Sequence, residues 1–466
     1  MTHRTFTAKF FRIAGSAFGL FVAAAQGGQA ALADPWAGRD EILRRIVAPN
    51  IPARDFVITD FGAVGDDRTD CRAALAAAIA ACTKTGGGRV VVPKGGFFCD
   101  GSIHLASNVN LHVSEGATIR FGAEPARYLP VVLTRFEGTM LYGHSPRIYV
   151  RGATNVAITG RGTIDGNARE TLALMKDSKA RGGSGTLRKM GADGVPVEQR
   201  IFGEGKWMRP SMIQPFECTN VLIEDVTLRD STFWVVHPVF CRNVTVRGIT
   251  VDSMNGNNDG CDPDSCVDVL IENCTFRTGD DAIAIKSGRD QDGWRVGRPT
   301  ENVVIRNITM GSRHSGLCIG SEMSGGVRNV FVEDCTADAV SSALYFKGNV
   351  DRGGFVECVR ARRITVRQVR DSLVRFDTTY RAQDIRGGTT APSFRDFLIE
   401  DVTCGDSRTY WLSIEGLAGT PIRDVTLRRV EVKKAATPTR LTQTENVRFE
   451  DVTINGQAQV AEPSRR

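Results

Sequence analysis

The feature that most constrains the fold is an eight-residue pattern that recurs from Asn155 onward. It reads Val, any residue, apolar, two variable residues, apolar, any residue, apolar, and an Asn or Asp usually precedes it. One copy, with its leading Asn, spans Asn220 to Leu228. Counted from Val221, later copies follow at intervals of 23, 25, 34, 27, 34, 33, 28 and 22 residues, at Val244, Val269, Val303, Val330, Ile364, Phe397, Val425 and Val447.

Each copy predicts two short strands joined by a bend, because its apolar residues alternate, break phase at a polar pair and alternate again. One copy cannot bury its own apolar face, so successive copies must stack, and extra length goes into loops. A propeller would need about 40 to 45 residues per blade, and a leucine-rich repeat would need regular Leu positions, which are missing. The sequence therefore predicts an all-β right-handed parallel β-helix, with its hand following the rule for parallel crossover connections.

The residues before the repeats predict a cap for one end of this solenoid. Phe56 to Ala63 reads as a strand that runs into a glycine turn, and Cys71 to Cys82 reads as an Ala-rich helix. A helix in this place suits the open end of a solenoid, where bare strand edges would promote aggregation. We therefore expect one catalytic domain, residues 34–466, with the N-terminal helical cap and first coils in residues 34–110.

Residues 1–33 have the organisation of a signal peptide. The apolar stretch is too short for a transmembrane helix, and no later stretch is long and apolar enough to span a bilayer. We expect a soluble, exported protein, periplasmic or extracellular, without a membrane span. The three parts of the signal are a basic start, an apolar stretch and a small-residue cleavage site: Arg4, Lys9 and Arg12; Ile13 to Ala25; and Ala31 to Ala33.

Net charge and cysteine content limit which binding partners, disulfides and metal sites are expected. The formal net charge of +6 favours a polyanionic partner, although a merely solvated basic surface fits it as well. Cys218, Cys241 and Cys266 each stand three residues before a repeat valine, so stacking would place them in a buried ladder. We expect free thiols there in preference to disulfides. No Cys or His spacing matches a zinc site, and no metal or other cofactor is expected.

Three aspartates are the candidate catalytic groups. Asp259 and Asp280 are 21 residues apart, about one repeat, so coiling would bring them onto neighbouring rungs. In a regular strand Asp280 and Asp281 would point to opposite faces, and both reach outward only if Gly279 lets the chain bend. Carboxylates brought together in this way raise at least one pKa, which allows a general acid to face a general base.

At these residues the sequence resembles the polygalacturonase family, glycoside hydrolase family 28. The family's motifs are Asn-Thr-Asp, Gly/Gln-Asp-Asp, Gly-His-Gly and Arg-Ile-Lys, in this order. Flanking stretches, including Trp234 to Pro238 and Ala284 to Arg289, resemble bacterial members, and the resemblance covers nearly the whole mature chain. The four motifs correspond here to Asn257-Asn258-Asp259, Gly279-Asp280-Asp281, Arg313-His314-Ser315 and Tyr345-Phe346-Lys347.

The resemblance implies an inverting glycoside hydrolase that works without a metal. Asp280 would protonate the glycosidic oxygen, while Asp259 and Asp281 would hold and deprotonate the attacking water. His314 would maintain the protonation state of the acid through a hydrogen bond, and Lys347 would bind a sugar carboxylate. Inversion needs the acid and the base about 6.5 to 9.5 Å apart.

Two departures from the family motifs bear on the substrate. Tyr345 replaces an Arg, which removes a bidentate carboxylate clamp, although a phenol can stack on a sugar or donate one hydrogen bond. The glycines that flank the histidine are replaced by Arg313 and a serine. We expect Arg313, Arg289 or Arg352 to restore the positive charge, and we also assign His237 to substrate binding.

The expected function is an exo-acting polygalacturonase that cleaves galacturonosidic linkages in pectic polysaccharides. A long basic insertion, Gly166 to Pro210, leaves the coils just before the aspartates and would wall off one end of the groove. Insertions at Gly288 to Pro299 and Thr378 to Thr390 would narrow it further. The alternative is a set of mobile loops that leaves the cleft open at both ends.

Three other functions stay open at this point. The substrate of a family member could instead be rhamnogalacturonan or xylogalacturonan. A calcium-dependent pectate lyase shares the β-helix, but needs a calcium-binding set of carboxylates and a basic proton abstractor. A non-catalytic polysaccharide-binding solenoid would keep the groove without needing all three aspartates. We expect a monomer and no nucleic-acid partner.

Overall fold

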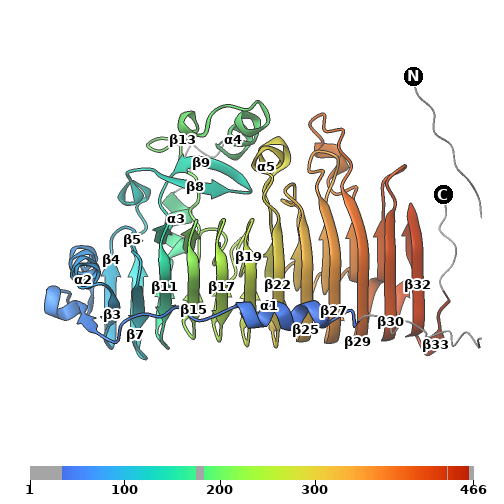
Figure 1. Cartoon of the computed structure of the whole chain (residues 1–466), viewed down its shortest axis with the longest axis horizontal. Coiled ribbons are helices and arrows are strands. Elements are labelled where there is room, and N and C mark those ends of the chain that lie inside the picture. Colours follow the sequence, from blue (N-terminus) through green and yellow to red (C-terminus); the bar gives the residue numbers. More distant parts are fainter. Residues whose placement is uncertain (1–33, 175–182, 438, 461–466) are drawn as a thin grey trace, which may run out of the picture. The chain divides into compact units, whose positions relative to one another are not determined.

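Alternation of inward and outward side chains makes each repeat copy a pair of short strands. In Thr219–Glu224 (β15) and Thr227–Arg229 (β16), Val221, Ile223 and Leu228 are at most 2% exposed and face the interior. The computed structural model describes residues 34–174, 183–437 and 439–460, and stacked coils of this kind make up most of them (Figure 1). The expected parallel β-helix is therefore confirmed.

The coil strands stack in parallel rows along the solenoid. In the first row the repeat valines lie opposite one another, as Val221 with Val244, and Val244 with Val269. The register that the repeat predicts is thus present. The row consists of β3 (Gly88–Val92), β6 (Val109–Val113), β11 (Thr154–Thr159), β15, β17 (Arg242–Arg247), β19 (Val267–Glu272), β22 (Thr300–Arg306), β25 (Val327–Val340), β27 (Phe355–Val369), β29 (Ser393–Glu415), β30 (Ile422–Thr437) and β32 (Thr444–Ile454).

A second row follows the bend inside each copy, and in the later coils it merges with the first because β25, β27, β29 and β30 run through the bend. Its separate strands are β2 (Asp66–Asp70), β4 (Gly95–Cys99), β7 (Ala117–Phe121), β12 (Thr163–Asp165), β16, β18 (Thr250–Ser253), β20 (Thr275–Thr278) and β23 (Thr309–Ser312).

A third row closes each coil and forms the floor beneath the candidate site. Single bridges through Val236 and Cys261 link its early strands to its later ones. The strands are β5 (Ile103–His104), β10 (Ile148–Arg151), β14 (Ile213–Phe216), β21 (Ile283–Ile285), β24 (Leu317–Ile319), β26 (Leu344–Lys347) and β28 (Ser372–Asp377).

The Asn that precedes many copies has a structural reason. Asn155, Asn220 and Asn243 have φ values of 56°, 57° and 56°, a left-handed conformation that Asn tolerates better than most residues. Their side-chain amides form a ladder, in which Asn220 donates to Asn155 at 3.0 Å and Asn243 donates to Asn220 at 2.7 Å. The ladder satisfies polar groups at the corner where each coil turns into the first row.

The cysteine ladder is also present, with free thiols. The backbone N–H of Cys218 donates to the sulfur of Cys241 at 3.4 Å, and the N–H of Cys241 donates to that of Cys266 at 3.4 Å. On the next coil the hydroxyl of Thr300 accepts the same kind of bond from Cys266 at 3.2 Å. All twelve cysteines lie in the described part of the chain and are unpaired.

Two helices flank the coils. The expected cap helix is α2 (Arg72–Lys84), which packs against β1 (Asp55–Val57), β3 and η1 (Ile58–Phe61) at one end of the solenoid. A second helix, α1 (Ala37–Arg45), runs along the outside of β19 and β22 (Figure 1). The sequence did not predict α1. Trp36 anchors it, since its ring lies under the Arg362 guanidinium at 3.8 Å and its Nε1 donates to Glu400 at 2.8 Å.

Several elements outside the three rows project on one side of the coils (Figure 1). Residues 1–33, which carry the expected signal, and residues 175–182 of the insertion lie outside the described residues. Within the described residues no helix has the length and apolarity needed to cross a membrane. The projecting elements include β8 (Val132–Phe136), β9 (Thr139–Gly143), α3 (Ala168–Leu174), α4 (Gly183–Ala192), β13 (Ile201–Phe202) and α5 (Asp290–Val296).

Candidate active site

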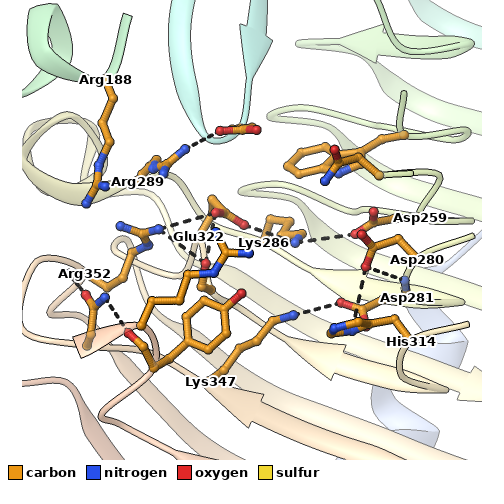
Figure 2. A pocket seen from close by; sticks show the side chains of 17 residues that line it. Arg188, Asp259, Asp280, Asp281, Lys286, Arg289, His314, Glu322, Lys347 and Arg352 are labelled. Carbon is orange, nitrogen blue, oxygen red and sulfur yellow. Dashed lines mark hydrogen bonds and ion pairs between the residues drawn. The ribbon is translucent and has the colours of Figure 1, made fainter. Parts of the chain in front are cut away.

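The predicted carboxylate cluster forms where successive coils pass from the second row to the third. Asp259 follows β18, Asp280 and Asp281 lie between β20 and β21, and His314 lies between β23 and β24. The backbone N–H of Gly260 donates to the carbonyl of Asp281 at 3.0 Å, so these turns are in direct contact. Figure 2 shows the four labelled side chains gathered on one side of a pocket.

The bend expected at Gly279 is present. Asp280 and Asp281 both line the pocket, although 25% of the Asp280 side chain is exposed and only 1% of the Asp281 side chain. A Cβ at Gly279 would lie 2.0 Å from the carbonyl oxygen of Asn255, so the neighbouring turn packs too closely for any other residue. The N–H of Asp281 donates to Oδ1 of Asp280 at 2.9 Å, which fixes one carboxylate relative to the other.

The neighbours of Asp281 hold its carboxylate in the ionised form. Its oxygens receive hydrogen bonds from Lys347 Nζ at 3.0 Å, from His314 Nδ1 at 2.7 Å and from the N–H of Ser315 at 2.9 Å. Burial alone would raise the pKa of Asp281, but Lys347 and His314 hold this pKa well below its ordinary value. A carboxylate of this kind stays charged in acid and is suited to holding and activating water.

His314 occupies a different place from the one expected. We expected its hydrogen bond to reach the acid, Asp280, but its Nδ1 bonds to Asp281 and lies 3.7 Å from Oδ1 of Asp280. The bond to Asp281 raises the pKa of His314, against the opposing effect of burial. A protonated imidazole between the two aspartates stabilises the ionised Asp281 and places a positive charge beside Asp280.

Asp259 differs from Asp281 although it lies in the same cluster. It is 3% exposed, and burial raises its pKa to about 7, with Asp280 and Asp281 adding to the rise. Lys286 forms an ion pair with it, with Nζ 3.6 Å from Oδ2 of Asp259. The two candidate water-binding carboxylates thus have opposite pKa shifts.

A network of buried charges faces the carboxylates from the other side of the pocket (Figure 2). Lys286 donates to Glu322 Oε2 at 3.1 Å, and Arg352 lies 3.5 Å from the other oxygen of Glu322. Arg352 also pairs with Asp290 of α5. Burial opposes the ionisation of Glu322, but Lys286 and Arg352 lower its pKa well below the ordinary value. The predicted Arg289 also lines this side and pairs with Glu137.

Three predicted substrate contacts are not supported by the positions of the residues. His237 is 0% exposed and packs beneath the pocket-lining Trp234, and its Nδ1 accepts a hydrogen bond from Gln214 at 2.9 Å. Tyr345 is 5% exposed, and its hydroxyl donates to Asp377 at 3.2 Å instead of facing the pocket. Arg313 is exposed but lies outside the pocket lining. Lys347, Arg289 and Arg352 do line the pocket.

Sequence reasoning missed several pocket residues. Lys286 and Asp259 face each other from adjacent coils, and alternation about the buried Ile283 and Ile285 already pointed Lys286 outward. Glu322 and Arg188 carried no such signal, because each comes from an irregular loop or an insertion. The described residues that line the pocket and were not predicted are Glu137, Arg188, Trp234, Asn257, Lys286, Ser321, Glu322, Asn349, Tyr380 and Arg381.

Asp280, Asp281 and His314 also present ligand atoms within 4.8 Å of one another. A cation there would compete with Lys347, which already neutralises Asp281 at 3.0 Å. His314 Nδ1 is likewise engaged with Asp281. The arrangement therefore fits acid–base chemistry among the side chains themselves better than it fits a metal centre.

Comparison with known proteins agrees with this geometry. The family model for glycosyl hydrolases family 28 matches residues 82–453. A probable polygalacturonase of Vitis vinifera is 32% identical over 325 residues, which cover 67% of this chain and 61% of that protein. The exo-poly-alpha-D-galacturonosidase of Dickeya chrysanthemi is 25% identical over 395 residues, 79% of this chain and 65% of that protein. The chain thus matches less than two thirds of the length of either relative.

A solved structure gives fuller coverage. The crystal structure of a hyperthermoactive exopolygalacturonase from Thermotoga maritima superposes with a TM-score of 0.86 at 40% sequence identity, and the match covers 90% of this chain and 96% of that one. The fold, the order of the motifs and the match to the family model lead to one conclusion. This chain belongs to glycosyl hydrolases family 28.

Proposed function

We propose that the protein is an exported, inverting hydrolase that releases galacturonic acid units from the ends of pectic polysaccharides. The observation that carries the proposal is the cluster of Asp259, Asp280 and Asp281 on touching turns, facing a network of paired cations and acids across one pocket. The family supplies the reaction class. The names of the Dickeya chrysanthemi and Thermotoga maritima proteins support action from a chain end.

The roles of the carboxylates follow from their surroundings. Asp280 is the most exposed of the three and stands nearest to solvent, where it can reach the glycosidic oxygen and deliver a proton. Asp281 stays ionised beside Lys347 and His314, and with Asp259 it holds the water that attacks the opposite face of the sugar. In an inverting enzyme the water attacks the anomeric carbon directly, and no covalent intermediate forms. Oxygens of Asp280 and Asp281 lie within 4.8 Å of each other, closer than the expected distance of about 6.5 to 9.5 Å. The proposal of inversion therefore rests on the resemblance to the family and not on this spacing.

The substrate's carboxylates require cations in the pocket. Lys286, Arg289, Lys347 and Arg352 line it, but each also pairs with an acidic side chain. The substrate therefore binds to a preorganised network of alternating charges. An incoming carboxylate shares the hydrogen-bond donors of these cations with the acidic side chains already bound to them. Such a network favours an acidic sugar over a neutral one, because a neutral sugar gains less from the cations.

The proposal that the enzyme acts from a chain end is supported by the insertions beside the pocket, on the side opposite the aspartates. Arg188 of α4 is 9% exposed, and it donates to Asp290 of α5 at 2.6 Å and to Asp351 at 2.9 Å. Asp351 also accepts the backbone N–H groups of Arg386 and Gly388 at 2.8 and 2.7 Å. Three separate insertions are thus tied together beside the pocket, which supports a groove closed at that end.

Export is part of the proposal because pectic polysaccharide lies outside the cell that secretes its hydrolases. The support is the organisation of residues 1–33, with a basic start, an apolar stretch and a small-residue cleavage site. Mass spectrometry of the N-terminus after expression in a secreting host tests it. A mature chain that begins near Asp34 agrees, and an intact Met1 with all protein in the cytoplasm contradicts it.

The activity itself is tested with a panel of pectic polymers. We expect new reducing ends from polygalacturonate, products without the ultraviolet absorbance of an unsaturated uronate, and full activity in a calcium chelator. Proton NMR during the first turnovers should show the inverted anomer. Unsaturated products that need calcium would show a lyase instead, and products from rhamnogalacturonan or xylogalacturonan alone would reassign the substrate.

A further inference from the structure

A carboxyl group that the proposed mechanism does not use lies buried next to the pocket. Asp262 follows Asp259 in the same coil and is 0% exposed. No N–H or O–H donor among the described residues reaches either of its oxygens. Burying an ionised carboxylate without donors carries a large free-energy cost, so the ordinary charged form of Asp262 does not suit this place.

The strand register fixes where Asp262 points. The preceding residue, Cys261, faces the core and bridges to Val236 and Ile283 of the neighbouring coils. Asp262 therefore faces away from the core, on the side of the pocket. Its counterparts one residue beyond those bridges are His237 and Ala284, both 0% exposed. Burial lowers the pKa of His237, so this neighbour is neutral.

The charged groups around Asp262 are Asp259 from its own coil and Lys286 and Asp281 from the next. Lys286 is already engaged with Gly320 O at 3.0 Å and with Glu322 at 3.1 Å. The Asp262 carboxyl lies within hydrogen-bonding reach of the carboxyl of Asp259. Two ionised carboxylates in this position would repel each other, whereas a carboxylic acid and a carboxylate attract through a shared proton.

We propose that Asp262 is a positioning residue that stays protonated and donates its O–H to Asp259, holding Asp259 ionised and aimed at the attacking water. The pair then carries one proton and titrates as a unit. Burial first and the charge of Asp259 second raise the pKa of Asp262 well above its ordinary value, in agreement with this assignment. The catalytic consequence rests on the proposed function, but the protonation of Asp262 does not.

This arrangement resolves a difficulty in the mechanism. Burial raises the pKa of Asp259 to about 7, so an isolated Asp259 would be protonated in acid and unable to accept a proton from water. If the proton of the pair resides on Asp262, Asp259 keeps its negative charge. Asp281 lacks this need, because Lys347 and His314 stabilise its charge directly.

Infrared spectroscopy tests the protonation without any substrate. Spectra of the wild type and of Asp262→Asn are compared at a pH above the value of about 7 to which the Asp259 pKa is raised. We expect the difference to show the loss of a protonated carboxyl C=O band. The control is Asp338→Asn, which removes an exposed carboxylate paired with Arg367 and should remove only a carboxylate band. Loss of a carboxylate band alone in Asp262→Asn would overturn the proposal.

Kinetics test the positioning. Asp262→Asn keeps an N–H donor for Asp259, so its kcat should stay within about threefold of the wild type. Asp262→Ala removes the donor and should lower kcat by about 10- to 100-fold with KM unchanged. The acidic limb of its pH profile should also move to higher pH, because the Asp259 pKa rises. Equal kcat and an unchanged pH profile in all three proteins would overturn the positioning role, as would equal losses in both variants.

Discussion

The two sides of the pocket are built in different ways. Asp259, Asp280, Asp281 and His314 come from the turns of three successive coils, so the register of the repeat sets their spacing. The opposite side draws Arg188 from an insertion helix, with other cations and acids from loops of varied length. In the proposed mechanism the first side carries the chemistry, and the second determines which part of a polymer enters the pocket.

The contrast extends to electrostatics. On the coil side three carboxylates crowd together and share Lys347, His314 and Lys286 as their positive partners. On the loop side nearly every charge has an opposite partner, as in the chain from Lys286 through Glu322 and Arg352 to Asp290. Such compensated networks are rigid and specific, and they add little net stability. Changes on the first side should therefore affect rate, and changes on the second should affect the pattern of products.

The largest effect should come from Asp280→Asn, which keeps the shape of the side chain but cannot deliver a proton. We expect kcat to fall by about 10²- to 10⁴-fold while binding of a pectic oligomer is largely retained. Steady-state kinetics and calorimetric binding measure the two quantities separately. Asp259→Asn and Asp281→Asn should also be severe, and their losses should not add to that of Asp280→Asn. Near-normal turnover in Asp280→Asn would remove Asp280 from the role of acid.

A smaller loss is expected for Lys347→Gln. Without the ammonium at 3.0 Å, the ionised form of Asp281 loses stabilisation and its pKa rises. A base must be deprotonated, so activity should disappear at a higher pH on the acidic side than in the wild type. We expect kcat/KM to fall by about 10- to 10²-fold near the optimum. The pH dependence of kcat/KM measures both effects. An unshifted acidic limb would show that Lys347 does not control the ionisation of Asp281.

Arg188→Gln tests the loop side and should alter products more than rate. It breaks the contacts that join α4 to Asp290 and Asp351, so the wall loosens while the carboxylates stay in place. We expect kcat on a short oligomer to change by less than about tenfold, with longer oligomers appearing among the early products of a polymer. Lys189→Gln is the matched control, because Lys189 is on the same helix but exposed and paired with Asp193 of the same insertion. Identical product patterns in both variants would show that Arg188 does not hold the insertions together beside the pocket.

The smallest effect on activity is expected in the coil corner, with Asn243→Ala. The amide of Asn243 bonds to Asn220 and to the Val47 carbonyl, and φ is 56°. Loss of these bonds and an Ala in the left-handed region should lower the free energy of unfolding by about 1 to 3 kcal/mol. Asn243→Gly should lose less, since Gly adopts this φ freely. Urea unfolding measures both, and equal losses would show that backbone strain is not involved.

The sequence predicted the regular side of the molecule well, for a physical reason. Each coil carries inward-facing valines, and these specify how the coils stack. Stacking in this register places the turns that carry Asp259 and Asp280 next to each other. Gly279 could be predicted as a bend because only a turn lets consecutive aspartates share a pocket. The helix α2 and the free thiols of the ladder were predicted on the same grounds, from local composition and register.

The irregular side could not be predicted in the same way. Position relative to a motif suggested pocket roles for Tyr345, Arg313 and His237, but the direction of each side chain depends on the neighbouring coils. Tyr345 turns to Asp377, and His237 turns to Gln214. Arg188 lies 102 and 163 residues from the aspartates that it binds, a pairing that no local pattern encodes.

A hydrolytic cluster at the closed end of a groove should act on chain ends, and viscosity measurements detect this directly. Polygalacturonate of high viscosity is incubated with the wild-type protein, while viscosity, reducing ends and product length are followed together. If the groove is closed at one end, monomer or dimer is released from the start while viscosity hardly changes. A rapid drop in viscosity with a mixture of oligomers would contradict it, because it would show that the groove is open at both ends.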